Sequence, residues 1–172
     1  MGTGGCLYKK SLQTWKKEAD DGDSKAALWA ALVYERKLVP DSSPEKSVPY
    51  LLQAAESGNL TAQGLLAFKY RDGLGVPQDA AKAVEWFEKA ASRKDLGAVM
   101  ELGIMFRDGK YLPPDREKAF HWFEKGAEWK DPYSMAALAD MLLEGTPSAE
   151  QAARALALYR EAAAAGYFPA AL

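Results

Sequence analysis

The sequence predicts an all-α fold, a right-handed α/α solenoid of stacked helical hairpins. The first observation is a repeat: "WFEKAA" at residues 86–91 returns as "WFEKGA" at residues 122–127, a period of 36 residues. The second is that apolar residues within each period are spaced as on one face of a helix, and no segment alternates as a half-buried strand does. Because one hairpin cannot bury its own apolar stripe, consecutive hairpins are expected to stack.

The repeat keeps one register along nearly the whole chain. Five segments align without a gap, beginning at Leu12, Val48, Val84, Phe120 and Leu156. An alanine column and a glycine column accompany them: Ala19, Ala55, Ala91, Ala127 and Ala163, and Gly73, Gly109 and Gly145. We therefore expect a flexible tail at 1–6 and one repeat domain at 7–172, with units of about 7–42, 43–78, 79–114 and 115–148 and a partial unit at 149–172.

Each unit is predicted to contain a helix A, a short turn, a helix B and a loop. In the third unit, Trp86 and Phe87 lie on the apolar stripe of helix A, and Asp79 is placed to cap its start. Gly109 tolerates the left-handed stop of helix B. The A helices are expected over 7–21, 44–57, 79–93, 115–129 and 149–165, and the B helices over 23–37, 59–72, 95–108 and 131–144.

Two further columns are predicted to set the packing between helices. Small residues let neighbouring helices approach closely, and aromatic residues fill the spaces between hairpins. The small residues are Ala67, Gly103 and Ala139, and the aromatic ones are Phe87, Phe123 and Tyr159. With the interior so occupied, function is expected on the faces and edges of the stack.

Charge and cysteine content exclude several classes of function. The net charge of −2 gives no overall attraction for nucleic acid or an anionic membrane. Cys6 is the only cysteine, which excludes an internal disulfide and a cysteine zinc cluster. "GLG" at 73–75 lacks the lysine and hydroxyl that follow in a nucleotide-binding loop. No apolar run is long enough to span a bilayer. We therefore expect no cofactor, no metal and no membrane span.

Two interpretations of the tail remain open. "TGGC" at residues 3–6 resembles the end of a bacterial lipoprotein leader, in which small residues precede a cysteine that becomes lipid-modified. On this interpretation Cys6 is a lipidation site and the protein is periplasmic or associated with the cell envelope. On the other, the segment is a Gly-rich tail or a tag scar with a chance cysteine, and the protein is cytoplasmic.

The consensus of the units resembles a known family. "A-x-x-W-F-x-K-A-A" at Ala83–Ala91, "A-x-x-x-L-G-x-M-F-x-x-G" at Ala98–Gly109 and "P-x-D-x-x-K-A" at Pro113–Ala119 are similar to Sel-one-like repeats, relatives of the tetratricopeptide repeats. The first unit departs from the pattern, since Lys37 and Val39 stand where later units have glycine. The last unit stops as its helix B should begin, so its helix A is expected to be a terminal cap or part of a longer array.

The resemblance implies a protein-binding adaptor or scaffold. Bacterial members include secreted and periplasmic proteins, host-interaction factors, and immunity proteins that neutralise lipase-type effectors of the type VI secretion system. The expected partner is therefore another protein, with a secreted effector enzyme as one candidate, and the expected state is a monomer. A cysteine-rich branch is associated with penicillin binding and hydrolysis, but this chain lacks the paired cysteines of that branch.

No catalytic residue is predicted. Nucleophile and base catalysis needs a group that titrates near neutral pH, and His121 is the only histidine. His121 shares its column with Pro49, Glu85 and Ala157, which is typical of a solvated face. A hydrolase is thus the disfavoured alternative, and His121 is instead a candidate for contact with a partner.

Candidate partner-binding residues lie on the concave side expected of the A helices and at the turns. One column is basic (Lys10, Lys46, Lys82, Lys118 and Arg154), and a second is partly basic (Lys17, Gln53, Lys89, Lys125 and Glu161). Two basic rows could hold an acidic peptide or patch. The alternative is that these lysines only solvate the helices and pair with Glu85, Glu88 and Glu124.

Large aromatic residues also stand where the repeat has polar or small ones. Trp129 shares its column with Asp21, Ser57, Arg93 and Ala165, and Tyr111, Tyr133, Tyr167 and Phe168 lie at loops and turns. Exposed aromatic residues are favoured binding anchors, although packing within a hairpin would explain them equally well. The candidate set is Lys82, Glu85, Lys89, Tyr111, Lys118, His121, Lys125, Trp129 and Tyr133.

Overall fold

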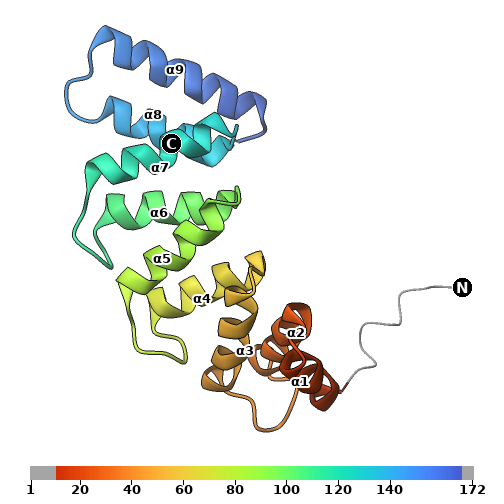
Figure 1. Cartoon of the computed structure of the whole chain (residues 1–172). Helices are drawn as coiled ribbons and strands as arrows, with labels where there is room; N and C mark the ends of the chain where they lie inside the picture. The colour runs from red at the N-terminus through yellow and green to blue at the C-terminus, as the bar shows by residue number, and fades with distance from the viewer. Residues whose placement is uncertain (1–10, 168–172) are drawn as a thin grey trace, which may run out of the picture. The chain divides into compact units, whose positions relative to one another are not determined.

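A computed structural model of the chain describes residues 11–167. These residues form nine α-helices and no strand (Figure 1). The helices are α1 (Leu12–Asp20), α2 (Ser24–Glu35), α3 (Pro44–Glu56), α4 (Leu60–Asp72), α5 (Ala80–Ala91), α6 (Leu96–Asp108), α7 (Arg116–Glu128), α8 (Pro132–Leu143) and α9 (Ala149–Ala164). The odd-numbered helices are the predicted A helices and the even-numbered ones the predicted B helices, so the helical hairpin is confirmed as the repeating element.

The predicted start of the first helix at Leu7 is wrong. Ser11 has an extended backbone, and its hydroxyl accepts a hydrogen bond from the N–H of Thr14, which is how a serine caps a helix. Helix α1 therefore begins at Leu12, and residues 7–10 lie outside the described residues. Every other predicted helix end lies within two residues of the observed one.

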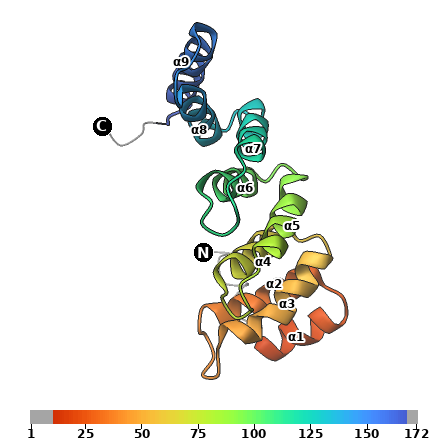
Figure 2. The ribbon, with the colours of Figure 1, turned by 90° about the vertical axis from the view of Figure 1, so that its left-hand side faces the viewer.

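The chain divides into two compact units, Met1–Ala90 and Ala91–Leu172. Consecutive helices pack on one another within each: α1 on α2, α2 on α3 and α3 on α4 in the first, and α6 on α7, α7 on α8 and α8 on α9 in the second. Figure 2 shows α8 and α9 side by side in the second unit. This order is what an array of hairpins requires.

The residues that cap the helix starts repeat with the same period as the apolar residues. The B helices α2, α4, α6 and α8 are all capped by a side chain at the same position of the unit, namely Asp23, Asn59, Asp95 and Asp131. The predicted cap of α5 is confirmed, because the Asp79 carboxylate accepts the N–H of Lys82 at 3.0 Å. These caps satisfy N–H groups that have no partner inside a helix.

Two columns of residues adopt the left-handed backbone conformation. The first lies at the A-to-B turn, where Gly22, Gly58, Lys94, Lys130 and Gly166 have φ of 95°, 81°, 63°, 62° and 89°. The second follows helix B, where Lys37, Gly73, Gly109 and Gly145 have φ of 53°, 71°, 66° and 77°. The backbone thus repeats even where the residue type does not. Three lysines occupy a conformation that suits glycine and costs other residues about 1–2 kcal/mol.

The predicted packing columns are confirmed in the interior. A Cβ atom added at Gly103 would lie 2.4 Å from Cε1 of Phe123, closer than two carbon atoms can approach, so only glycine fits under this ring. Phe87 is fully buried and meets Phe68 edge to face, with ring centroids 5.1 Å apart. Tyr159 differs: it is half-buried, and its hydroxyl donates to the Asp140 carboxylate.

A buried charge joins three helices of the first unit. Lys69 in α4 is only 5% exposed, and its Nζ lies 2.6 Å from the carboxylate of Glu35 in α2 and 3.2 Å from the carbonyl of Leu74. The hydroxyl of Ser47 in α3 donates to the same carboxylate. The corresponding position in other units is apolar (Val33, Met105 and Met141). The ion pair therefore replaces an apolar contact at this one repeat.

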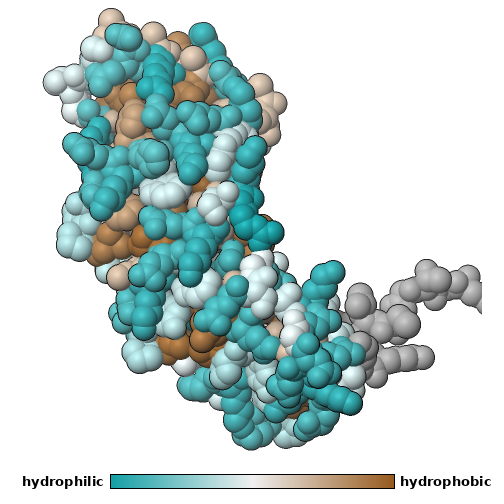
Figure 3. Space-filling view, in the orientation of Figure 1, coloured by the Kyte–Doolittle hydropathy of each residue, from teal (hydrophilic) through white to brown (hydrophobic). Residues whose placement is uncertain are grey.

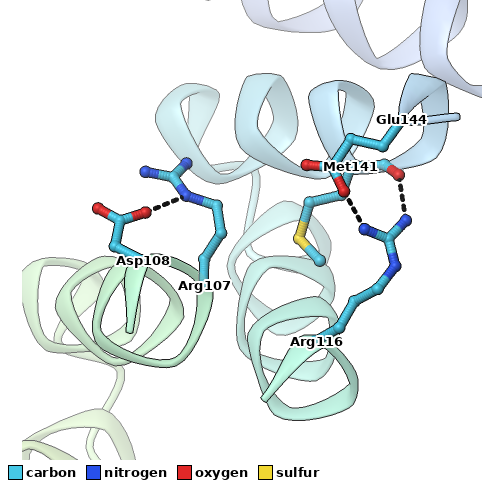
Figure 4. Close-up of polar contacts among 5 residues, drawn as sticks. All are labelled: Arg107, Asp108, Arg116, Met141 and Glu144. Carbon is cyan, nitrogen blue, oxygen red and sulfur yellow. Dashed lines mark hydrogen bonds and ion pairs between the residues drawn. The ribbon is translucent and has the colours of Figure 1, made fainter. Parts of the chain in front are cut away.

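Arg116, at the start of α7, reaches the end of α8 in the same hairpin. Its Nη2 donates to the Met141 carbonyl at 2.7 Å, and its Nη1 contacts the Glu144 carboxylate (Figure 4). The last carbonyls of a helix have no intrahelical partner and carry partial negative charge. Arg116 satisfies one of them, and so links the start of α7 to the end of α8.

Candidate protein-binding site

The first predicted basic row is paired with local acids. Lys82 lies 3.6 Å from the carboxylate of Asp79, and Lys118 lies 3.3 Å from that of Asp115. The hydrogen bond from the Lys118 backbone N–H also holds the pKa of Asp115 below its usual value. Lys46 is likewise paired with Asp41. These contacts favour the alternative interpretation, in which the lysines neutralise the capping end of their own helices.

Two lysines of the second row cover tryptophan rings. The Nζ of Lys89 lies 3.8 Å from the ring centroid of Trp86, and that of Lys125 lies 5.0 Å from the ring of Trp122. A cation over an aromatic face is attracted by the quadrupole of the ring. The second row thus protects the two tryptophans that fill the repeat, and its charges remain at the surface.

Trp129 packs between two lysines. It is the C-cap residue of α7 and is half-buried, with its ring 5.5 Å from Nζ of Lys125 and 5.9 Å from Nζ of Lys94. His121 is exposed and meets Trp122 edge to face at 5.4 Å. Lys125 and Trp129 therefore lie together at the C-terminal end of α7. His121 lies one turn before Lys125 on the same helix, beside Trp122.

The other candidates lie apart from this group. Tyr133 in α8 is 57% exposed and contacts Tyr167, with ring centroids 4.9 Å apart. Tyr111, in the loop before α7, is half-buried, and Nζ of Lys110 lies 4.8 Å from its ring. Glu85 is exposed on α5 with Lys82 and Lys89, in the first unit. Cys6, Lys10 and Phe168 lie outside the described residues.

A cavity that the sequence did not reveal lies between α7, α8 and α9. Its volume is about 200 Å³, and we call it the α7–α9 pocket. It is lined by Glu124, Ala127, Glu128, Lys130, Met135, Leu138, Arg154, Leu158 and Glu161. The floor is apolar, since Ala127, Met135 and Leu138 are buried, and the rim is charged. Figure 3 shows apolar patches recessed among hydrophilic side chains on the face that it presents.

Two ion pairs run across the rim of the pocket. Nζ of Lys130 lies 2.8 Å from the Glu161 carboxylate, and Nη2 of Arg154 lies 2.7 Å from that of Glu124. Both pairs join α7 or its C-terminal turn to α9. They are partly exposed, so each contributes about 0–1 kcal/mol to stability. The fifth charged residue of the rim, Glu128, is exposed and makes no ion pair with any residue in 11–167.

The pocket exists because one position of the repeat carries a smaller side chain in the last unit than in the two units before it. Trp86, Trp122 and Leu158 occupy the same position in successive A helices. Both tryptophans are buried, whereas Leu158 is half-buried beside the pocket. Leucine cannot occupy the volume that tryptophan fills in the neighbouring units, and the space remains open to the surface. The replacement at Leu158 was the sequence signal that could have located the pocket.

Residues 11–167 contain no candidate membrane span and no candidate metal cluster. None of their helices is long and apolar enough to cross a membrane. Over the same range, no group of three or more histidine, cysteine, aspartate or glutamate residues is arranged to hold a metal ion.

Comparisons with known proteins agree with the observed fold. The model of the Sel1 repeat matches residues 24–59, 61–95, 97–128 and 132–167. A search of curated protein sequences finds no significant match. Among solved structures, c5321, described as a protective antigen of uropathogenic Escherichia coli with an SLR fold, is 29% identical, with a TM-score of 0.78. A Sel1 repeat protein from Oxalobacter formigenes is 26% identical, with a TM-score of 0.79.

In each match, the covered share of this chain is larger than the covered share of the solved structure. The chain is covered over 92% and 91% of its length, but it spans only 34% of the first protein and 65% of the second. The predicted class, an all-α solenoid of stacked hairpins, is confirmed by these similarities and by the nine helices of residues 11–167. With four matched repeats across most of its length, the chain belongs to the Sel1 repeat family, whose members are generally protein-interaction modules without enzymatic activity.

Proposed function

We propose that this protein is a non-enzymatic adaptor that binds another protein through the surface of α7 and α9 and the aromatic residues at the adjoining turns. The observation that carries the proposal is the α7–α9 pocket, in which apolar residues lie at the base of a charged rim. Buried apolar anchors surrounded by polar contacts dominate the free energy of most protein interfaces.

Two residues at the C-terminal end of α7 support the assignment of the interface to this surface. Lys125 and Trp129 lie next to each other, each directly follows a pocket residue in the sequence (Glu124 and Glu128), and Lys125 is half-exposed. A tryptophan held between two lysines is already ordered, so little side-chain entropy would be lost on binding. Lys125 and Trp129 are therefore the predicted residues that we assign most directly to the interface.

The hydrolase alternative receives no support from the geometry around His121. In residues 11–167 no carboxylate accepts a hydrogen bond from its ring, and its one aromatic contact is with Trp122. A catalytic histidine needs a nucleophile within hydrogen-bond reach and a group that orients the ring. We expect purified protein to show no esterase turnover that the substitution His121→Ala removes.

Within the binding class, the specific role that we propose is immunity against a secreted lipase-type effector, in the periplasm or cell envelope and with the protein as a monomer. The family resemblance supports this role, and a general scaffold or host-interaction factor is the alternative. Immunity requires a gene for a toxic secreted enzyme beside the gene for this protein, and inhibition of that enzyme by the purified chain at a 1:1 ratio. A neighbouring effector whose activity the chain leaves unchanged excludes the role.

The experiment that tests the proposed function is capture of the partner in its native setting. The full chain carrying a tag is expressed in the source organism, cross-linked in intact cells and purified, and captured proteins are identified by mass spectrometry. We expect one protein that excess untagged chain displaces in a saturable manner. If no captured protein is displaced, the adaptor function is wrong.

A further inference from the structure

We infer that the α7–α9 pocket receives one aromatic side chain of the partner, from a segment in which a lysine or arginine lies next to that aromatic residue. The inference rests on the proposed binding function and gives the partner segment a chemistry. It follows from the size of the pocket, from its floor and from the charges of its rim.

The size of the pocket fits an aromatic side chain. An apolar protein cavity of about 150 Å³ accommodates benzene, and the α7–α9 pocket has about 200 Å³ and opens to the surface. It lies where Leu158 stands in place of the tryptophan of the two preceding units, Trp86 and Trp122. A partner aromatic ring would thus occupy the space that the repeat itself fills elsewhere.

The floor of the pocket matches such a ring. Ala127, Met135 and Leu138 lie at the base and are 8%, 2% and 0% exposed, and the half-buried Leu158 beside them offers the more accessible apolar surface. A methionine side chain is flexible and polarizable, and it makes favourable sulfur contacts with aromatic rings. No polar side chain belongs to this floor, so a polar group placed there would lose its hydration without gaining a hydrogen bond.

The charges of the rim select the residue next to the ring. Arg154 and Lys130 are each neutralised by a glutamate, at 2.7 Å and 2.8 Å. Glu128 is the remaining rim charge and has no ion-pair partner in the described part of the chain. A lysine or arginine beside the aromatic residue would pair with Glu128, whereas an acidic neighbour would be repelled. The rim therefore also disfavours nucleic acid, whose phosphates would face the same carboxylate.

The test uses the full chain with 13C-labelled methionine and leucine methyl groups, titrated with three blocked dipeptides and followed by NMR. N-acetyl-Trp-Lys-amide should shift the methyl signals of Met135, Leu138 and Leu158 with saturation. N-acetyl-Trp-Glu-amide should bind about two- to fivefold more weakly, as expected for the loss of one exposed ion pair. N-acetyl-Ala-Lys-amide should produce no saturable shift, because it carries no ring.

Two variants and one matched control locate the site. Leu158→Trp restores the side chain of the repeat and should abolish the shifts at Met135 and Leu138. Leu156→Trp adds the same side chain to the same helix at a position that is 50% exposed and outside the pocket lining, and it should bind as the parent chain does. Glu128→Lys should reverse the preference and favour the Trp-Glu probe, and this surface change tests the proposal even if Leu158→Trp fails to fold.

Several outcomes would overturn the inference. They are the absence of saturable shifts with any probe, unchanged shifts in Leu158→Trp, and equal affinity for the Trp-Lys and Trp-Glu probes. Pocket signals that change with protein concentration alone would show that a second copy of the chain occupies the pocket. If Leu158→Trp captures the native partner as well as Leu156→Trp does, the pocket assignment is wrong and the adaptor function stands. If the parent chain captures nothing, the adaptor function itself is wrong.

Discussion

Three lysines show how strongly the repeat constrains single residues. Lys37, Lys94 and Lys130 adopt positive φ at positions where other units have glycine. Lys94 and Lys130 also contribute side-chain contacts, with Trp129 and Glu161 respectively. Lys37 is exposed and stands in the first unit, where the family pattern is weakest. Its backbone strain is therefore the easiest of the three to isolate.

Replacing Lys37 with glycine should stabilise the protein. Glycine removes the cost of the left-handed conformation, about 1–2 kcal/mol, but it loses about 0.5–1 kcal/mol through the greater freedom of the unfolded chain. We expect a net gain of about 0.5–1 kcal/mol in the free energy of unfolding, measured by urea denaturation. Lys37→Ala is the control and should change little, so equal behaviour of the two variants would refute the explanation.

The hydroxyl of Tyr159 gives the fold a dependence on alkaline pH. Burial and the hydrogen bond to the Asp140 carboxylate raise the pKa of Tyr159 to about 12, above the unfolded value of about 10. The neutral hydroxyl is thus favoured in the folded protein, and its contribution is complete below about pH 10. It should be lost as the pH rises towards 12. Urea denaturation across this range should show a smaller decline for Tyr159→Phe; identical declines would contradict the assignment.

At the scale of the helix, the ion pair between Lys69 and Glu35 shows that a unit can depart from the repeat and keep its fold. It links α2, α3 and α4, where other units use valine or methionine. Burying a charged pair gains little over an apolar contact of similar volume, but removing one partner is costly. The pair is therefore a replaceable solution to the packing of these helices.

Substitutions at Lys69 should separate packing from charge. Lys69→Met supplies the residue found in two other units, and Glu35 is exposed enough to stay hydrated, so we expect a change within about 1 kcal/mol. Lys69→Ala leaves a void as well, and it should cost about 2–4 kcal/mol. Thermal unfolding followed by circular dichroism measures both variants. A methionine variant as unstable as the alanine variant would show that the charge itself is required.

The sequence predicted the helices well because their determinants are local. The apolar stripe, the caps at Asp79 and Asp95 and the glycine stops lie within one unit, and they repeat often enough to be recognised. The start of α1 was predicted too early because the helical pattern of the sequence extends back to Leu7, whereas the cap at Ser11 makes the helix begin at Leu12. The pocket was missed because it results from a smaller residue at Leu158, and the space it leaves depends on three helices at once.

The sequence located candidate binding residues but not the contacts that their side chains make. A column of lysines is visible in the sequence, but the pairing of Lys82 and Lys118 with aspartates depends on side-chain rotamers and on the position of each cap. The replacement of a polar or small residue by an aromatic one in a single unit was a second signal. It identified Trp129, and the structure adds that Lys94 and Lys125 hold its ring in place.

At the scale of the whole molecule, we assign protein binding to the second unit, Ala91–Leu172. The family indicates protein binding, and the open pocket and the group of Lys125 and Trp129 lie on α7 and its neighbours. The first unit carries Lys82, Glu85 and Lys89 on α5, and the closed Lys69 network in its interior. We therefore expect substitutions on α7 to weaken binding more than equivalent ones on α2.

The most direct measurement is the affinity of the captured partner, by isothermal titration calorimetry, for the parent chain and two charge-reversal variants. Lys125→Glu changes the proposed interface on α7, and Lys25→Glu makes the same change at an exposed position of α2. Circular dichroism should show unchanged helicity in both. We expect Lys125→Glu to weaken binding at least about tenfold, the effect of losing an interfacial contact worth about 1.4 kcal/mol, and Lys25→Glu to bind as the parent does. Equal affinity of the two variants would contradict the claim that α7 binds the partner.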